Sequence, residues 1–399
     1  MGLRVAVVGA GIGGLTLAHA LRRRGIDCVV LDRDAGPGAT DGYRLHLTEQ
    51  AFAALAEVLP ESSVRALRAC GAGNETFRQF AMLDHRGHTR LRIPVRHSGE
   101  VLLIGRRPLR TILARGLENH IRWGTTVTEP PGPEFDLVVA ADGTGSRIAR
   151  QWVGRPTGRP AGVIGIAGRS RLPQRIPADL RDGLAFMIGP RGVGAFLSLQ
   201  AEHGDDPAAE KPYVVWSVAA PLQTADEELK QLAHRLTTGW TADLHALIDQ
   251  SEPGSVAAFP FFFPAALEPW PAGRVTLLGD AVHPMPPTAG AGASTAILDA
   301  VHLARDLATM PTAQALATYQ ARLLRYAPRA VDEARPALRW QRRLARPALF
   351  ALATEVGLPL AAAGLRLAQT ARSTGAVLIS APASSAGSGL DMKKPWPSR

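Results

Sequence analysis

A glycine-rich turn near the N-terminus constrains the fold of this chain more than any other feature. Residues 9–14 read GAGIGG; they follow an apolar segment at 3–8 and precede a helical pattern over 15–24. In a strand–turn–helix unit, such glycines let a pyrophosphate approach the backbone at the positive end of the helix. The pattern predicts a dinucleotide-binding βαβ unit whose phosphate-binding glycines are Gly9, Gly11, Gly13 and Gly14.

An acidic residue stands where this unit needs one. The second apolar segment, 28–31, ends at Asp32. In dinucleotide-binding folds a carboxylate at the end of the second strand accepts hydrogen bonds from the ribose hydroxyls. We therefore expect Asp32 to bind the ribose of the cofactor.

Composition excludes several classes of protein. The chain has 399 residues, 46% of them hydrophobic and 20% charged, so it can bury a large core. Its net charge of +10 comes mainly from scattered arginines without a recognisable nucleic-acid-binding module, and we expect no nucleic-acid partner. Cys28 and Cys70 are too few for a disulfide framework, and the histidines lack metal-ligand spacing, so no metal is expected.

The sequence also bears on location. No uncharged apolar run reaches the roughly 20 residues that a membrane-spanning helix needs, so we expect no membrane span. The N-terminal apolar run is short and breaks into glycines, which is not typical of a secretory signal. The expected location is the cytoplasm, and the expected assembly is a monomer or homodimer.

The apolar pattern changes along the chain and predicts a discontinuous α/β fold. Segments 76–83 and 89–93 suggest a hairpin, and further strands are expected at 163–169, 184–188, 195–200, 213–219 and 255–263. These strands predict an antiparallel sheet inserted into the nucleotide-binding domain. Short apolar strands at 135–140 and 274–278 and helices over 295–370 restore the α/β pattern.

The expected domains follow from this pattern. The nucleotide-binding domain comprises 1–75, 98–160 and 268–325, and the antiparallel-sheet substrate domain comprises 76–97 and 161–267. A C-terminal helical segment is expected over 326–383 and a flexible tail over 384–399. Within the helical segment, 347–371 is amphipathic and is expected to pack on the core. Capping of the substrate pocket, contact with a partner chain and a membrane-surface role are the alternatives.

Two further acidic turns end predicted strands. Asp142 follows 137–140, and Gly279-Asp280 follows 275–278 and enters a Pro- and Gly-rich loop that opens a helix. A carboxylate at a strand end can bind a ribityl hydroxyl. Backbone N–H groups at the start of that helix, around 291–293, can face a carbonyl oxygen with developing negative charge.

The ordered set of G-x-G-x-x-G, Asp-Gly and G-D-A-x-H-x-x-x-P-x-x-G-x-G resembles the single-component FAD-dependent aromatic hydroxylases, over roughly 3–325. This family has the p-hydroxybenzoate-hydroxylase-type fold and includes salicylate-hydroxylase-like and tetracycline-inactivating monooxygenases. The resemblance implies resident FAD in a Rossmann-like domain, transient NADPH or NADH, and O2 as co-substrate. It implies insertion of one oxygen atom into an aromatic or polycyclic molecule, such as a secondary metabolite, through a flavin hydroperoxide.

The resemblance also implies roles for individual residues. By this resemblance Gly9, Gly11 and Gly14 serve the pyrophosphate, Asp32 and Arg33 the adenosine end, and Arg106 another part of FAD. Arg44 lies where the family's chain passes the flavin, and Asp142 matches a motif used for both FAD and the nicotinamide. The remaining residues expected at the ribityl chain or flavin ring are Gly279, Asp280, Pro287, Gly290, Gly292 and Ala293. Two positions depart from the family: Asp32 replaces the usual Glu, and Ser294 replaces an Asn.

Other candidates leave alternatives open. His46 is either a base that activates a substrate hydroxyl or a polar neighbour of the flavin, and His283 is expected to hold its loop. Met187, Phe196 and Phe261 are candidate walls of the substrate pocket, with ordinary core packing as the alternative. A flavin-dependent reductase without oxygen transfer and a non-enzymatic ligand-binding protein remain competing functions.

Overall fold

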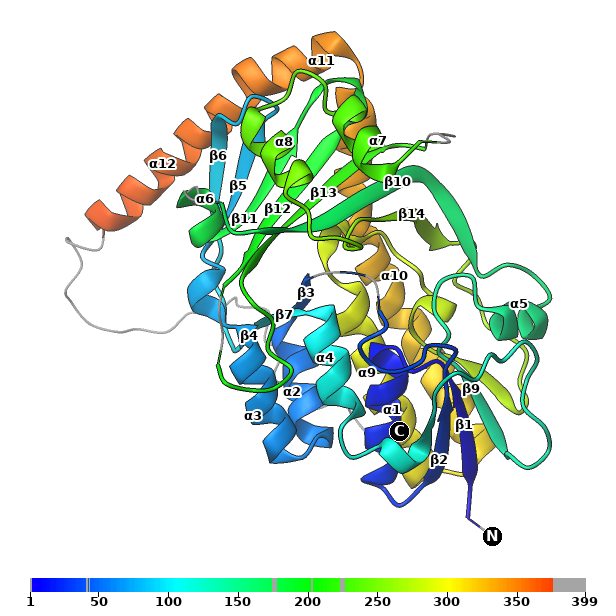
Figure 1. The fold of residues 1–399 in the computed structure, drawn as a ribbon. Helices are drawn as coiled ribbons and strands as arrows, with labels where there is room; N and C mark the ends of the chain where they lie inside the picture. Colours follow the sequence, from blue (N-terminus) through cyan, green and yellow to red (C-terminus); the bar gives the residue numbers. More distant parts are fainter. Residues whose placement is uncertain are drawn as a thin grey trace.

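Two sheets and a set of long helices organise the chain. The computed structural model describes residues 2–40, 42, 44–173, 178–201, 204–222 and 227–375. One layer is a parallel sheet with helices, and the other is a larger sheet that lies beyond the ends of the first (Figure 1). The expected flexible tail, 384–399, lies outside the described residues.

The parallel sheet joins segments that are far apart in sequence. Its strand order is β15-β9-β1-β2-β8, and every neighbouring pair is parallel. The strands are β15 (Val275–Leu277), β9 (Leu137–Ala140), β1 (Arg4–Val8), β2 (Asp27–Leu31) and β8 (Ile121–Arg122). β1 and β9 are buried almost throughout, as expected for strands covered on both faces. The expected discontinuous Rossmann-like sheet is confirmed.

Helices complete this layer. α1 packs against α9, and α9 also contacts α10 and α2. Their bounds are α1 (Ile12–Arg22), α2 (Glu49–Val58), α3 (Glu61–Cys70), α4 (Arg106–Ala114), α5 (Arg147–Val153), α9 (Gly292–Thr309) and α10 (Thr312–Leu344). The expected domain boundary at residue 325 falls inside the continuous helix α10, so the C-terminal helical segment has no separate start there.

The second sheet is mixed, where the sequence predicted an antiparallel one. Its order is β14-β10-β13-β12-β11-β5-β6, and β5 pairs with β11 in parallel. The strands are β5 (Gln79–Asp84), β6 (Thr89–Pro94), β10 (Gly158–Arg171), β11 (Gly183–Ile188), β12 (Gly194–Gln200), β13 (Tyr213–Pro221) and β14 (Ala257–Pro264). The β5–β6 hairpin comes from an earlier part of the chain, so no tight turn forces it to run antiparallel to β11.

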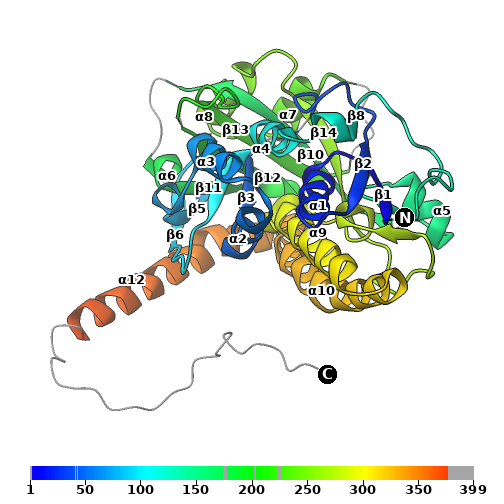
Figure 2. The same cartoon turned by 90° about the horizontal axis from the view of Figure 1, so that it is seen from below.

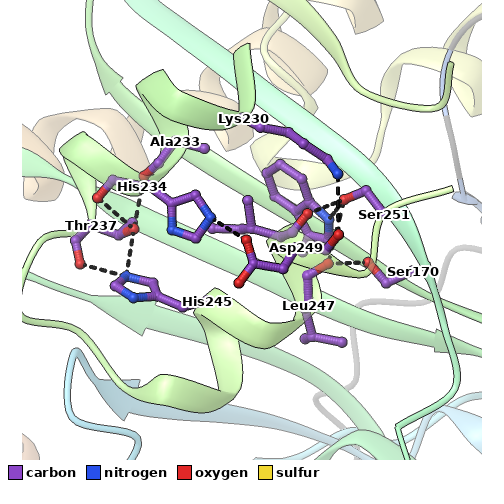
Figure 3. A network of polar contacts seen from close by, with 11 residues as sticks. Ser170, Lys230, Ala233, His234, Thr237, His245, Leu247, Asp249 and Ser251 are labelled. Carbon is purple, nitrogen blue, oxygen red and sulfur yellow. Dashed lines mark hydrogen bonds and ion pairs between the residues drawn. The ribbon is translucent and has the colours of Figure 1, made fainter. Parts of the chain in front are cut away.

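Helices α7 (Leu229–Leu236) and α8 (Ala242–Asp249) cover the outer face of this sheet, over a core that includes Trp216. Two polar contacts stabilise this region. His234 Nε2 lies 2.8 Å from Asp249 Oδ1 (Figure 3). Trp216 Nε1 donates to Ser251 Oγ at 3.0 Å. The first contact joins α7 to α8, and the second joins the chain just after α8 to β13. A four-residue helix, α6 (Ala178–Arg181), lies beside β11.

A small antiparallel sheet connects the layers. β7 (Leu102–Gly105) pairs with both β3 (Arg44–Leu47) and β4 (Gly71–Ala72). β7 leads directly into α4, and β3 contacts α9. This sheet places Arg44 and His46 between the parallel sheet and the mixed sheet.

The C-terminal helices correct one expectation. α11 (Pro347–Leu352), a π-helical turn (Ala353–Gly357) and α12 (Leu358–Gly375) form one continuous helical segment. Residues Pro347–Leu367 have a mean hydropathy of 1.7 and are long and apolar enough to cross a membrane, yet only 11% of them are buried. The expected packing on the core is wrong, because the segment extends past the edge strand β6 (Figures 1 and 2).

Candidate active site

Four acidic or glycine-rich turns meet at one edge of the parallel sheet. They follow β1, β2, β9 and β15, whose carboxyl ends share an edge because the strands are parallel. The contacts are direct: Gly9 N donates to Leu31 O at 2.8 Å, and Ala141 N donates to Val8 O at 2.8 Å. The structure therefore brings together the three motifs that are widely separated in the sequence.

Each glycine of the first turn is required for a different structural reason. Gly9 has φ of +108°, and a Cβ there would meet Ala141 O at 2.4 Å. A Cβ on Gly14 would lie 1.9 Å from Gly9 O, and one on Gly13 would lie 2.5 Å from Leu278 Cδ2. Gly11 is different, because open space surrounds its Cβ position at the N-terminus of α1. Gly9, Gly13 and Gly14 shape the turn, while Gly11 leaves room for a ligand.

Asp32, just after β2, is held by the glycine-rich turn after β1. Its Oδ2 accepts from Ala10 N at 2.5 Å and its Oδ1 accepts from Asp34 N at 2.8 Å. Arg110, which is nearly fully buried, lies 3.3 Å from Asp32 and donates to Ala10 O at 2.8 Å. Sequence reasoning missed Arg110. Its signal was the spacing of four from Arg106, which puts both arginines on one face of α4.

Asp142 anchors the turn after β9. Its Oδ1 accepts from the hydroxyl of Ser146, a residue that sequence reasoning also missed. The same hydroxyl accepts from Ala149 N at 2.9 Å and caps α5. Burial raises the pKa of Asp142, although the exposed Arg33 lowers it in part. Arg33 thus acts on this turn as well as standing beside Asp32.

Asp280 belongs to the turn after β15 and faces the turn after β9. Burial raises the pKa of its carboxyl, and the charges of His283 and Arg106 oppose that rise. Thr144 Oγ1 donates to Asp280 at 3.4 Å. Arg106 donates through Nε to Thr40 Oγ1 at 3.2 Å. The carboxylate and the guanidinium expected at FAD are therefore close enough to interact electrostatically.

Asp299 of α9 stabilises the turn after β15. Asp299 Oδ2 accepts from Gly279 N at 2.9 Å and lies 2.7 Å from His283 Nε2, while Oδ1 accepts from the Tyr326 hydroxyl. Burial opposes the charged imidazole, but the carboxylates of Asp299 and Asp280 outweigh it and raise the pKa of His283. His283 holds the loop, in line with its expected structural role.

The Pro- and Gly-rich loop passes between Asp280 and His46. Pro287 begins a short 3-10 turn, and Gly290 follows with φ of +64°. A Cβ on Gly290 would lie 3.5 Å from His46 Cβ, and one on Gly292 would lie 3.9 Å from Asp280 Oδ1. α9 then starts at Gly292 and continues through Ala293. The loop expected beside the flavin ring thus has Asp280 on one side and His46 on the other.

Ser294 has a structural partner rather than an open face. Its hydroxyl donates to His46 O at 3.2 Å and accepts from Thr48 N at 3.1 Å. Both bonds fasten β3 to the start of α9. The replacement of the family's Asn at this position therefore serves to fix the backbone of His46.

Arg44 and His46 bring buried polar atoms without protein partners. Arg44 Nη1 donates to Ser198 Oγ at 2.7 Å and to Leu199 O, whereas Nε and Nη2 have no hydrogen-bond partner among the described residues. Burial lowers the pKa of Arg44 to about 10. His46 Nε2 is equally unpaired within the described chain, and burial lowers the pKa of this imidazole. Buried polar groups are normally satisfied, so these atoms point to a bound polar ligand.

Comparison with known proteins decides the family. The FAD binding domain family matches residues 134–334, and an NAD(P)-binding Rossmann-like domain family matches residues 7–52. The chain is 30% identical over 350 residues to the aurachin C monooxygenase/isomerase of Stigmatella aurantiaca, covering 80% of this chain and 85% of that protein. The chain belongs to the FAD-dependent monooxygenases.

Two more relatives support this assignment. A 3-amino-4-hydroxybenzoate 2-monooxygenase of Streptomyces platensis is 32% identical over 337 residues, covering 75% of this chain and 78% of that one. The crystal structure of a putative FAD-containing monooxygenase from Photorhabdus luminescens superposes with a TM-score of 0.72 at 28% identity, covering 86% and 98% of the two chains.

The residues of this monooxygenase fit FAD. The space at Gly11 lies at the N-terminus of α1, where the first N–H groups of a helix lack intrahelical partners and favour a phosphate. The buried carboxylate of Asp280 and the unpaired N–H groups of Arg44 supply an acceptor and donors for the polar parts of a flavin nucleotide. A dinucleotide with a long polar chain matches this series of turns.

An aromatic row extends from His46 onto the mixed sheet. The ring of His46 meets Phe77 edge-on at 5.2 Å, Phe77 meets Phe80 at 4.8 Å, and Phe80 meets Phe186 at 5.9 Å. Phe186 lies 5.2 Å from Phe196. Phe80, Phe186 and Phe196 are only half-buried. The row forms an apolar wall on the inner face of the sheet, next to the loop that starts at Pro287 and passes His46.

The three predicted pocket residues lie in three different environments. Phe196 lies on the inner face, but Met187 is wrong as a pocket wall, because it packs in the core beneath α7 and α8. Side chains alternate along a strand, so Met187 points away from Phe186. Phe261 is buried against α10, among residues that include Val331 and Leu338.

Proposed function

We propose that this monooxygenase oxidises an aromatic or polycyclic small molecule held between the loop at 287–293 and the inner face of the mixed sheet, with NADPH or NADH as electron donor. The observation that carries the proposal is the half-buried aromatic row from His46 to Phe196 beside that loop. Flat aromatic molecules pack well against such rings. The 3-amino-4-hydroxybenzoate named for one relative belongs to the same chemical class.

When bound, FAD supplies the redox chemistry that activates oxygen. The protein binds and orients it: we assign the turn at Gly11 to the pyrophosphate, Asp32 to the adenosine ribose, and Asp280 to the ribityl chain. Arg106 and Arg44 supply positive charge and N–H donors along the same path. Arg33, Asp142, Gly279, Pro287, Gly290, Gly292 and Ala293 complete the proposed cofactor site.

The apolar row has a second task in this proposal. Phe77, Phe80, Phe186 and Phe196 exclude water from the space above the loop, and water exclusion protects reactive oxygen chemistry from side reactions. His46 remains neutral near pH 7 because burial lowers its pKa. Its unpaired Nε2 can then accept a proton or hydrogen bond from a substrate hydroxyl.

The domain division, with the substrate domain at 76–97 and 161–267, is part of the proposal. Its support is that β5, β6 and β10–β14 share one sheet while β1, β2, β8, β9 and β15 share another. We also propose a cytoplasmic location and a monomeric or homodimeric assembly. A cytoplasmic enzyme has direct access to reduced nicotinamide.

The test starts from the absorption spectrum of the purified protein. We expect bound flavin, and NAD(P)H oxidation that is stimulated by members of a panel of phenols and aromatic polyketides, with oxygen uptake and a product that has gained one oxygen atom. Flavin reduction without oxygen in any product would instead identify a reductase. A colourless protein without NAD(P)H oxidation would identify a ligand-binding protein.

Asp280→Ala tests the cofactor site separately. We expect this variant to lose bound flavin while its circular dichroism stays that of the wild type. The matched control is Asp332→Ala, which removes an exposed carboxylate from α10. Tight flavin retention in Asp280→Ala would refute the assignment of this residue.

A further inference from the structure

The C-terminal helical segment presents an unusual amount of apolar surface. We call Pro347–Leu367 the C-terminal arm. Only 11% of it is buried, although its mean hydropathy is 1.7. Six of the nine large apolar side chains that are exposed in the described part of the chain lie between residues 340 and 367. Exposed apolar surface concentrated in this way marks an interaction site.

The exposed residues form one stripe along the arm. Leu349, Leu352, Val356, Leu360 and Leu367 follow one another at spacings of three, four, four and seven. A spacing of three places Leu349 and Leu352 on one face before the π-helical turn, and a spacing of seven places Leu360 and Leu367 on one face after it. All five side chains are exposed, so this apolar stripe faces solvent on both sides of the π-helical turn and runs the length of the arm.

The other side of the arm is attached to the protein. Thr354 and Ala362 are buried, and α12 packs against the edge strand β6. The ring of Phe350 lies 5.6 Å from that of His85, and Glu355 pairs with Arg90 of β6 at 3.3 Å. The one acidic residue of the arm is thus engaged by the protein, and the stripe is left to face outward. Figures 1 and 2 show α12 extending from β6 away from the body.

Positive charge accompanies the arm. Residues 339–354 contain Arg339, Arg342, Arg343 and Arg346 and no acidic residue. Pro336, Arg339, Trp340 and Arg343 line a shallow pocket at the surface immediately before the arm. The guanidinium of Arg343 lies 5.9 Å from the centre of the Trp340 ring. Exposed tryptophan and arginine beside an apolar helix are typical of the boundary between lipid and water.

We propose that the C-terminal arm docks this monooxygenase on an anionic membrane surface. The apolar stripe enters the acyl boundary, and Arg339, Arg343 and Arg346 contact lipid phosphates, while Arg342 donates to Ala161 O within the protein. The charge pattern favours lipid over a second copy of the chain, because two copies with a net charge of +10 would bring the same arginine clusters together. The contacts with β6 favour an arm that lies on the membrane rather than one that spans it.

The first experiment is flotation of the full-length, flavin-loaded enzyme with vesicles of phosphatidylcholine alone and with one third phosphatidylglycerol. We expect binding to the anionic vesicles and little binding to the neutral ones. Leu352→Glu with Leu360→Glu should weaken binding at least tenfold. The control is Leu222→Glu, which places the same charge at a similarly exposed leucine (52% against 57% for Leu352) outside the arm, and should bind as the wild type does.

The second experiment separates charge from apolar contact. Arg339→Gln with Arg343→Gln should weaken binding to anionic vesicles by about fivefold per arginine removed, and added salt should weaken wild-type binding. Arg23→Gln with Arg150→Gln, which removes two exposed arginines elsewhere, is the control for net charge. Flavin absorbance and the unfolding temperature establish that each variant is folded.

Three outcomes would overturn the proposal: no binding to either vesicle, equal binding to neutral and anionic vesicles, or unchanged binding of the Leu352→Glu, Leu360→Glu double variant. A dimer in light scattering that this double variant dissociates, without vesicle binding, would show that a second copy covers the stripe instead.

Discussion

Arg110 lies 3.3 Å from Asp32, and its Nε donates at 2.8 Å to the carbonyl of Ala10, whose own N–H donates to the Asp32 carboxylate. The guanidinium also donates to Asp34 at 2.6 Å. One buried arginine thus fixes the glycine turn and the acidic strand end relative to each other. In the proposed cofactor site both elements bind FAD, so we expect Arg110 to be a positioning residue for the adenosine end.

Arg110→Gln should therefore weaken FAD binding at least tenfold and lower the free energy of unfolding by about 3 kcal/mol, because it leaves the buried carboxylate of Asp32 without its counter-charge. Flavin fluorescence titration and urea unfolding measure the two effects. Arg150→Gln, at an exposed position on α5, is the control and should change neither. Wild-type flavin affinity in Arg110→Gln would contradict the positioning role.

Gly11 and Gly14 should respond differently to alanine. A Cβ at Gly14 would lie 1.9 Å from Gly9 O, so Gly14→Ala should cost about 3 kcal/mol of stability through overpacking. In Gly11→Ala the new Cβ meets no atom of the described residues within 4 Å, so this variant should leave the apoprotein as stable as the wild type while weakening flavin binding. Thermal unfolding of apoprotein and flavin titration compare the pair. Normal flavin binding by Gly11→Ala would show that the pyrophosphate does not approach this position.

His283 should make stability depend on pH. Asp299 and Asp280 raise its pKa against the opposing effect of burial, so the folded state holds this proton more tightly than the unfolded chain does. Its stabilising contribution is complete below about pH 6.5, the ordinary histidine pKa, and is lost as the pH rises through the higher folded value. In urea unfolding between pH 6 and 9, the wild type should lose stability relative to His283→Gln. A difference between the two proteins that stays constant with pH would contradict this account.

Phe196 and Met187 test which face of the mixed sheet meets the substrate. Phe196→Ala should raise the KM for an aromatic substrate and increase NAD(P)H oxidation without product, because it opens the inner aromatic row. Met187→Ala should instead lower stability by about 2–4 kcal/mol through a cavity in the outer core, with an unchanged KM. Steady-state kinetics with product analysis distinguish the two. A larger KM change in Met187→Ala would reverse the assignment of faces.

Much of the fold could be predicted because it depends on local pattern. The turn at Gly9–Gly14 and the strand that ends at Asp32 lie where glycine spacing and apolar runs put them. The β5–β6 hairpin and its turn after Asp84 also form as expected. In each case neighbouring residues along the chain carry the whole signal.

Other features depend on contacts between distant segments. The sequence did not predict the parallel pairing of β5 with β11, since those strands are separated by the return of the chain through the parallel sheet. Arg110 escaped notice because its partners, Ala10 and Asp32, are far from it in sequence. Periodicity showed that Met187 and Phe186 face opposite sides of their strand, but not which side faces the flavin loop.

By itself the sequence determined the phosphate-binding turn, the alternation of strands and helices, and the family, because these depend on residue identity and short spacing. Only the tertiary structure decided which face of the mixed sheet lines the site, which arginine fixes Asp32, and that the apolar arm at 347–367 lies outside the core. The physical reason is that burial and electrostatic pairing are properties of surfaces assembled from separate segments, and one segment alone carries no record of the surface that will cover it.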